Sequence, residues 1–134
     1  MRRTTLCLAL AMVLGFGFLG RGAPEARAVN TFRVEFIAKY VKADSEDAKD
    51  KAFAAAVEKA KCGICHEGKN KKNRNAYGKA LDELLDPEND ADSKEKIQAA
   101  LKKVESKRPD PKDEKSPTFG DLIKAGKLPA APKS

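Results

Sequence analysis

The sequence predicts an all-α domain of four to five short helices. Apolar residues recur every three to four positions in several separate stretches, which is the periodicity of amphipathic helices. No stretch alternates apolar and polar residues as a half-buried strand does, and no internal repeat is present. Proline and glycine fall between the periodic stretches, where they interrupt helices.

Residues 1–28 are predicted to be a secretory signal peptide. Arg2 and Arg3 precede an apolar run of 14 residues, Leu6 to Leu19, and Ala26-Arg27-Ala28 ends the segment with small residues. The run is shorter than the about 20 residues that cross a membrane. We expect cleavage after Ala28, a mature domain over residues 29–134, and a periplasmic or secreted location. An uncleaved segment that stays in the membrane as an anchor is the alternative.

The first predicted helix of the domain carries Phe32, Phe36 and Tyr40 on one stripe, and Asn30 or Thr31 is a suitable N-cap. These aromatic side chains are expected to pack on the core. Tyr40 could alternatively reach a bound cofactor.

The second predicted helix begins after Ser45, which can cap it. Its apolar face is formed by Phe53, Ala56, Val57, Ala60 and Ile64. This helix leads directly into a pair of cysteines, Cys62 and Cys65.

The remaining helices follow a polar, basic loop at residues 67–75. Apolar stripes within residues 77–85 and 97–104 predict the third and fourth helices, which end before Pro87 and Pro109. A short last helix is expected after Ser116-Pro117, with Phe119 facing inward and Gly126 as its end. Residues 127–134 are expected to form a loose tail.

The pentapeptide Cys62-Gly63-Ile64-Cys65-His66 is the most informative stretch of the sequence. The spacing C-x-x-C-H is typical of c-type haem attachment. Each thiol can add its sulfur and its hydrogen across one vinyl group of the porphyrin, which gives two thioether bonds. The adjacent imidazole then lies beside the iron as an axial ligand.

Three other interpretations of the two cysteines remain open. A structural zinc site would need an acidic fourth ligand in addition to Cys62, Cys65 and His66. A thioredoxin-like redox pair should follow a strand, and no strand pattern precedes Cys62. A plain disulfide is the third possibility. The only histidine of the sequence directly follows the second cysteine, and this favours haem.

Residues 60–66, together with Asn75-Ala76-Tyr77-Gly78-Lys79-Ala80-Leu81, resemble the single-haem c-type cytochromes, in particular the small, class I-like cytochromes that bacteria export. The resemblance implies one covalent haem c on Cys62 and Cys65, with His66 as the proximal iron ligand. It also implies a cytochrome c-like arrangement of helices around the haem. Over residues 45–126 the resemblance lies in the order and spacing of the helices.

The sixth iron ligand is not evident from the sequence. The family usually supplies a methionine, but the two methionines here, Met1 and Met12, both fall in the predicted signal peptide. Other possibilities are the α-amino group of Val29 after cleavage, water, an open site or a ligand from a partner chain. The side chains considered as distal ligands are Tyr77, Tyr40, Lys112 and Lys115.

The charge of the chain bears on its function. Cleavage after Ala28 would remove four basic residues and one acidic residue, which lowers the formal net charge from +7 to +4. This mixed, mildly basic composition argues against nucleic-acid binding. The cationic loop at residues 69–74 could instead pair with haem carboxylates or dock an acidic redox partner protein.

Electron transfer by a mono-haem cytochrome is the function that these observations favour. A haem protein or a subunit of a complex, with an open or unusual sixth site that binds a small molecule such as NO or CO, is the alternative. Independent catalysis is not expected, because peroxide chemistry would need a distal acid–base group. Beyond His66, the predicted mature chain offers only Arg33, Arg74 and Arg108 for that role.

Overall fold

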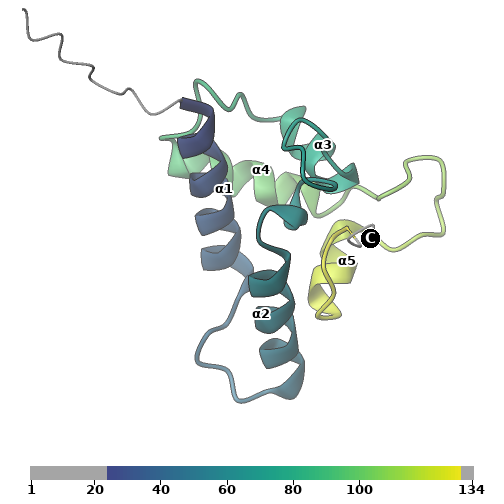
Figure 1. The fold of residues 1–134 in the computed structure, drawn as a ribbon. Helices are drawn as coiled ribbons and strands as arrows, with labels where there is room; N and C mark the ends of the chain where they lie inside the picture. The colour runs from purple at the N-terminus through teal and green to yellow at the C-terminus, as the bar shows by residue number, and fades with distance from the viewer. Residues whose placement is uncertain (1–23, 131–134) are drawn as a thin grey trace, which may run out of the picture.

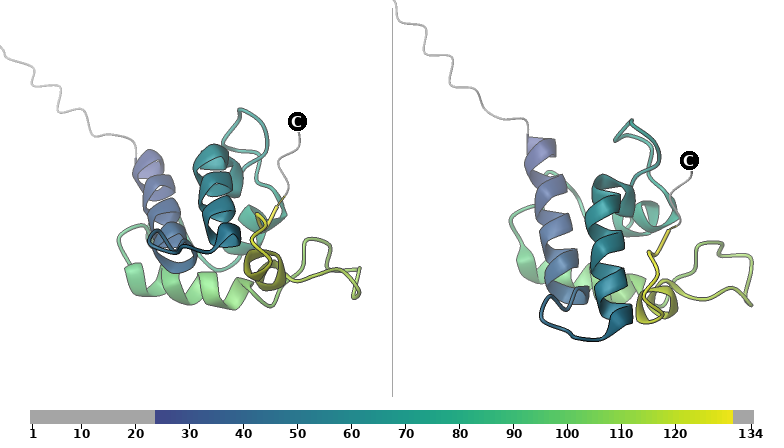
Figure 2. Two further views of the ribbon diagram at one scale, coloured as in Figure 1. Left: turned by 90° about the horizontal axis from the view of Figure 1, so that it is seen from below. Right: turned by 60° about the horizontal axis from the view of Figure 1, so that its bottom comes forward.

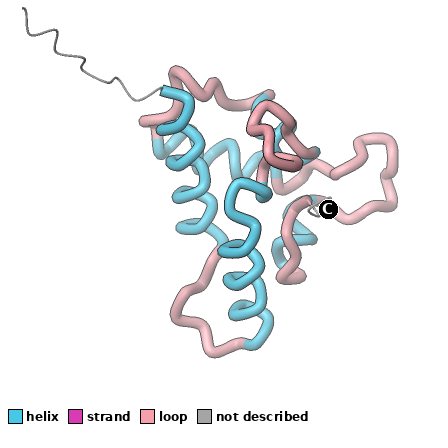
Figure 3. Tube along the Cα trace, in the orientation of Figure 1, coloured by secondary structure: helices cyan, strands magenta, loops and turns pink. Residues whose placement is uncertain are grey.

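The computed structural model describes residues 24–130 and, within them, five α-helices and one short 3₁₀ helix. The helices are α1 (Pro24–Tyr40), α2 (Ala48–Ala60), η1 (Lys61–Ile64, the 3₁₀ helix), α3 (Ala76–Asp82), α4 (Lys94–Val104) and α5 (Phe119–Lys124). Loops join them, and no strand is drawn in this part of the chain (Figure 3). The all-α prediction is therefore confirmed for the described residues.

Helices α1 and α2 lie side by side and run in opposite directions (Figures 1 and 2). Helix α4 packs against both α1 and α3, and η1 continues from α2 toward α1. None of the helices within residues 24–130 combines the length and the apolar character that a membrane crossing requires.

The core is formed by the apolar stripes that the sequence predicts. Its buried members are Phe36, Phe53, Val57, Ile64, Tyr77, Ala80, Leu81, Leu85, Ile97, Ala100, Leu101, Val104 and Phe119. Aromatic rings link three helices, because Tyr77 of α3 lies 5.9 Å from Phe36 of α1 and 5.2 Å from Phe119 of α5 between ring centroids. Both contacts are edge-to-face, a favourable geometry for aromatic pairs.

Two predicted helix starts are wrong. Helix α1 begins at Pro24 rather than after Asn30 or Thr31, because proline is well suited to a first helical position and the following residues continue the helix. The predicted cleavage point after Ala28 thus falls inside α1, while residues 1–23 of the predicted signal peptide lie outside the described residues.

At α2 the N-cap is Asp47, whose carboxylate accepts hydrogen bonds from the backbone N–H of Lys49 and Asp50. Ser45 instead donates its hydroxyl hydrogen to the carboxylate of Asp50 at 2.7 Å. Both residues are good caps by type, and this competing contact decides between them.

The expected loose tail is also wrong over its first residues. Pro129 is fully buried, and Leu128 and Ala130 pack against the core. The sequence after Gly126 therefore adds to the packed domain as far as residue 130, and residues 131–134 lie outside the described residues.

Candidate functional site

The cysteine pair lies on a tight turn at the end of α2. The backbone N–H groups of Cys65 and His66 both donate to the carbonyl oxygen of Cys62, at 3.2 and 3.0 Å. Lys61 ends α2 with φ 48° and ψ −112°, a conformation that residues other than glycine rarely adopt. This reversal turns the chain out of α2, and the two thiols and the imidazole follow within five residues.

Asn75 joins this turn to the start of α3. Its side-chain nitrogen donates to the carbonyl oxygens of Gly63 and Ile64, each at 3.1 Å. Its side-chain oxygen accepts from the N–H of Gly78 at 2.9 Å, which makes Asn75 the N-cap of α3. Its own N–H donates to Cys65 at 3.0 Å. A single residue, only 4% exposed, thus fixes the backbone on both sides of the motif.

Gly78 allows α3 to lie directly against the cysteine turn. A Cβ atom at this position would stand 2.0 Å from the carbonyl oxygen of Cys65. Atoms cannot approach so closely, so any side chain here would push α3 away from the motif.

The polar loop after His66 folds back beside it. His66 and Arg74 form an isolated antiparallel bridge, and the N–H of Glu67 donates to the carbonyl of Asn73 at 2.8 Å. Lys69, Lys71 and Lys72 are exposed in this loop. The prediction of a polar loop next to the motif is confirmed, and Lys71 and Arg74 of this loop line the cavity described next.

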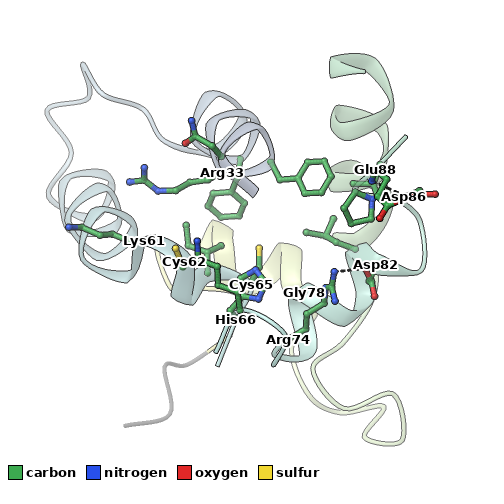
Figure 4. Close-up of a pocket in the computed structure, with 18 of the residues that line it drawn as sticks. Arg33, Lys61, Cys62, Cys65, His66, Arg74, Gly78, Asp82, Asp86 and Glu88 are labelled. Carbon is green, nitrogen blue, oxygen red and sulfur yellow. Dashed lines mark hydrogen bonds and ion pairs between the residues drawn. The ribbon is translucent and has the colours of Figure 1, made fainter. Parts of the chain in front are cut away.

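A cavity of about 770 Å³ opens beside the motif, between α1, η1 and α3 (Figure 4). Cys62, Cys65 and His66 all line it. Its apolar lining residues are Phe32, Phe36, Ile64, Leu81, Leu85 and Pro87. A cavity of this volume, whose wall combines apolar surface with charged side chains, can hold a small molecule or cofactor.

The two thiols have different surroundings. Cys62 is exposed, whereas Cys65 is enclosed by protein and is open only in part, at the cavity that it lines. Burial raises the pKa of the Cys65 thiol to about 12. Cys65 therefore stays protonated at neutral pH, and both thiols are free.

The ring of His66 lies against the loop that follows it, where the backbone of Lys71 and Asn73 interacts with the imidazole. Its Nδ1 atom is buried without a hydrogen-bond partner. Burial, together with the nearby Arg74 guanidinium, lowers the pKa of the imidazole, so the ring is neutral at pH 7. A neutral imidazole is the form that binds metal ions.

The four proposed distal ligands do not line this cavity. Tyr40 donates its hydroxyl hydrogen to Leu101 and Glu105 of the α4 region, both at 3.0 Å. Tyr77 is fully buried in the core, and Lys112 and Lys115 are exposed in the loop between α4 and α5. Their positions along the chain made these residues candidates, but position alone does not fix the direction of a side chain.

Sequence reasoning also missed several residues of the site. Asn75 and Gly78 hold the motif, and Phe32, Arg33 and Phe36 bring α1 to the cavity. An asparagine directly before an apolar helical stripe was an available signal for the N-cap. The sequence brought α1 to a cofactor only through Tyr40, whereas the structure places Phe32, Arg33 and Phe36 at the cavity.

The alternative metal site has no geometric support in the described residues. Between residues 24 and 130, no three or more His, Cys, Asp and Glu side chains converge on a point where a metal ion could bind. No protein-family model, no curated protein and no solved structure matches this chain.

Proposed function

We propose that this protein is a mono-haem c-type cytochrome that transfers single electrons outside the cytoplasm. The observation that carries the proposal is the cavity beside the C-x-x-C-H motif, with both thiols and the imidazole on its wall. Free thiols at this spacing suit the two vinyl groups of one porphyrin. The apolar part of the wall suits the porphyrin ring. The lowered pKa of the His66 imidazole keeps it neutral, which is the form that binds a metal ion, and its Nδ1 atom has no hydrogen-bond partner.

Each residue would have a distinct part in this function. Cys62 and Cys65 would hold the haem covalently, and His66 would be the proximal iron ligand. Phe32 and Phe36 of α1 would exclude water from the face of the porphyrin that they contact. A bound haem supplies reversible one-electron chemistry between ferric and ferrous iron.

The exposed lysines beside the motif support electron exchange with a partner protein. Lys69, Lys71 and Lys72 lie in the loop that follows His66, close to the exposed Cys62 edge of the motif. Such a cationic rim would favour the approach of an acidic redox partner and would make the association rate fall with ionic strength.

A haem protein with an open sixth site is the second candidate function. The observation that favours it is that Tyr40, Tyr77, Lys112 and Lys115 all lie away from the cavity lining. In addition, residues 24–130 contain no methionine and no second histidine. An open position would allow a small ligand such as NO or CO to bind the iron.

Absorption spectra of the protein, produced together with haem-attachment enzymes, test both candidates. We expect covalent haem that remains on the chain after denaturation. A low-spin spectrum that CO does not change would support electron transfer. A high-spin spectrum that shifts with CO would support the second candidate, and absence of covalent haem would contradict both.

The variant His66→Ala tests the role of the proximal ligand. We expect haem to stay attached, wholly or in part, because the thioether bonds do not depend on the imidazole, but its spectrum should change because an axial ligand is lost. Lys72→Ala, in the same exposed loop but outside the cavity lining, is the matched control and should keep the parental spectrum. An unchanged spectrum in His66→Ala would contradict the assignment.

A further inference from the structure

Arg33 of α1 has a buried donor that the folded chain leaves unused. Its Nε atom is buried without a hydrogen-bond partner, and the residue lines the cavity. The one ion pair of its guanidinium joins a terminal nitrogen to Glu58 of α2 at 3.1 Å. The Glu58 side chain is 73% exposed, so this pair is mostly in solvent and contributes little.

Buried polar atoms without a partner are costly, and two of those in the described part of the chain belong to residues of one cavity. Within residues 24–130, three buried side-chain polar atoms lack a partner, namely Arg33 Nε, His66 Nδ1 and the Tyr77 hydroxyl. The first two belong to residues that line the same cavity. A ligand that accepts a hydrogen bond from Arg33 Nε would remove the cost of leaving that donor buried and unpaired.

The second arginine of the cavity differs from Arg33. Arg74 pairs with Asp82 at 2.9 Å, and none of its three side-chain nitrogens is a buried atom without a partner. Arg74 and Asp82 therefore satisfy each other, whereas Arg33 keeps an unused donor.

Charge is distributed unevenly around the cavity. Arg33 and Lys61 lie at the edge formed by α1 and α2, together with Glu58, which pairs with Arg33. Asp82, Asp86 and Glu88 lie at the opposite side, together with Arg74, which pairs with Asp82 (Figure 4). A ligand that carries carboxylates along one edge would therefore be oriented with that edge toward Arg33 and away from the acidic side.

We propose that Arg33 binds a carboxylate of the ligand in this cavity, and this rests on the proposed function, in which that carboxylate is a haem propionate. The guanidinium presents Nε and a terminal nitrogen in the planar geometry that matches a carboxylate in two hydrogen bonds. The bound carboxylate replaces the weak solvent-exposed contact with Glu58. Arg33 thereby sets the orientation of the ligand and neutralises one of its charges.

The test compares two forms of one ligand. The full chain with Cys62→Ala and Cys65→Ala is titrated with haemin and with haemin dimethyl ester, whose carboxylates are blocked, and binding is followed by absorbance. Adding Arg33→Gln should weaken haemin binding about tenfold or more, the loss expected for a charge-assisted pair. The same substitution should change binding of the ester less than about twofold, since the ester has no carboxylate to lose.

Two further variants separate carboxylate binding from a structural role. Arg33→Lys keeps the charge but loses the paired donors, so its haemin affinity should lie between those of the parent and Arg33→Gln. Glu58→Gln removes the competing carboxylate and should bind haemin as tightly as the parent or more tightly. If Arg33 acted only through its ion pair with Glu58, then Arg33→Gln and Glu58→Gln would instead lower the haemin affinity to the same extent.

The protein with attached haem gives an independent measurement. Arg33→Gln should make the midpoint potential more dependent on pH between about pH 5 and 8, because a propionate without its cationic partner titrates at higher pH. If Arg33→Gln lowered the affinity for haemin and for its ester equally, or left the haemin affinity unaltered, the role of Arg33 would be overturned. The proposed function would not be affected by that result. Failure of the parent to take up haem in any form would overturn the proposed function and this inference with it.

Discussion

The two cysteines differ in reactivity because the fold surrounds them differently. With a pKa of about 12, the Cys65 thiol forms very little thiolate at pH 9, whereas Cys62 is exposed. In the protein without haem, we expect iodoacetamide to label Cys62 first and Cys65 about a hundredfold more slowly. Peptide mass spectrometry over a time course measures both rates. In denaturant the rates should become similar, and equal rates in the folded protein would contradict the burial of Cys65.

Gly78 should be sensitive to the smallest possible side chain. Gly78→Ala places a methyl group against the Cys65 carbonyl, and we expect the free energy of unfolding to fall by about 3 kcal/mol. Gly63→Ala is the matched control, since a Cβ there meets only the Ala60 Cβ at 4.0 Å. Urea unfolding of the protein without haem measures both values. A Gly78→Ala protein as stable as the control would mean that α3 does not contact the motif.

At the residue scale, the sequence identified the residues of the motif but not their contacts. Cys62, Cys65 and His66 were found because their spacing is encoded locally, and the structure places all three on one cavity. Tyr40 and Tyr77 do not line that cavity, because their rings follow the apolar stripes of α1 and α3 into the core. A stripe defines a face of a helix, but the packing of helices decides what that face meets.

The connection between η1 and α3 depends on Asn75. We expect Asn75→Ala to lower the free energy of unfolding by about 3 kcal/mol, because it removes an N-cap and leaves two carbonyl groups without their donor. Asn73→Ala is the control, since Asn73 is exposed in the loop just before. Chemical denaturation gives the values, and equal stabilities would contradict the bridging role of Asn75.

At the element scale, periodicity predicted which helices exist but not where each begins. The stripes within residues 77–85 and 97–104 gave α3 and α4, whose apolar faces are buried as expected. The starts of α1 and α2 were missed because several residues in a row could serve as caps, and distant or competing contacts decide among them. The part that α1 plays in the cavity depends on its contacts with α4, more than fifty residues later in the sequence.

At the scale of the whole molecule, the part-buried hydrogen bond from Tyr40 of α1 to Glu105, at the end of α4, should affect stability in acid. Burial alone would raise the pKa of Glu105, but hydrogen bonds from Lys102 and Tyr40 outweigh it and hold the pKa below the ordinary value of 4.5. Because the folded state holds the proton less tightly than the unfolded state, this stabilisation is present above pH 4.5 and is lost as the pH falls through the folded pKa.

The variant Glu105→Gln should therefore be less stable than the parent at neutral pH, by about 1 kcal/mol, and the difference should shrink as the pH falls below 4.5. Thermal unfolding of the protein without haem, followed by circular dichroism across this range, measures it. Glu114→Gln, in the exposed loop before α5, is the control and should show no such trend. A difference that does not vary with pH would contradict the carboxylate's role.

The wall that α1 forms has a consequence for the order of events in a new chain. The motif, its loop and α3 come from one continuous stretch, residues 61–82, so their contacts can form as soon as that stretch is available. Helix α1 is made first but is held by Gln98 and Leu101 of α4, which are made much later. In a chain that emerges N-terminus first, the thiols thus remain accessible from the α1 side throughout that interval. Under the proposed function, the sequence order of the helices would provide a period for covalent haem attachment before the fold encloses Cys65.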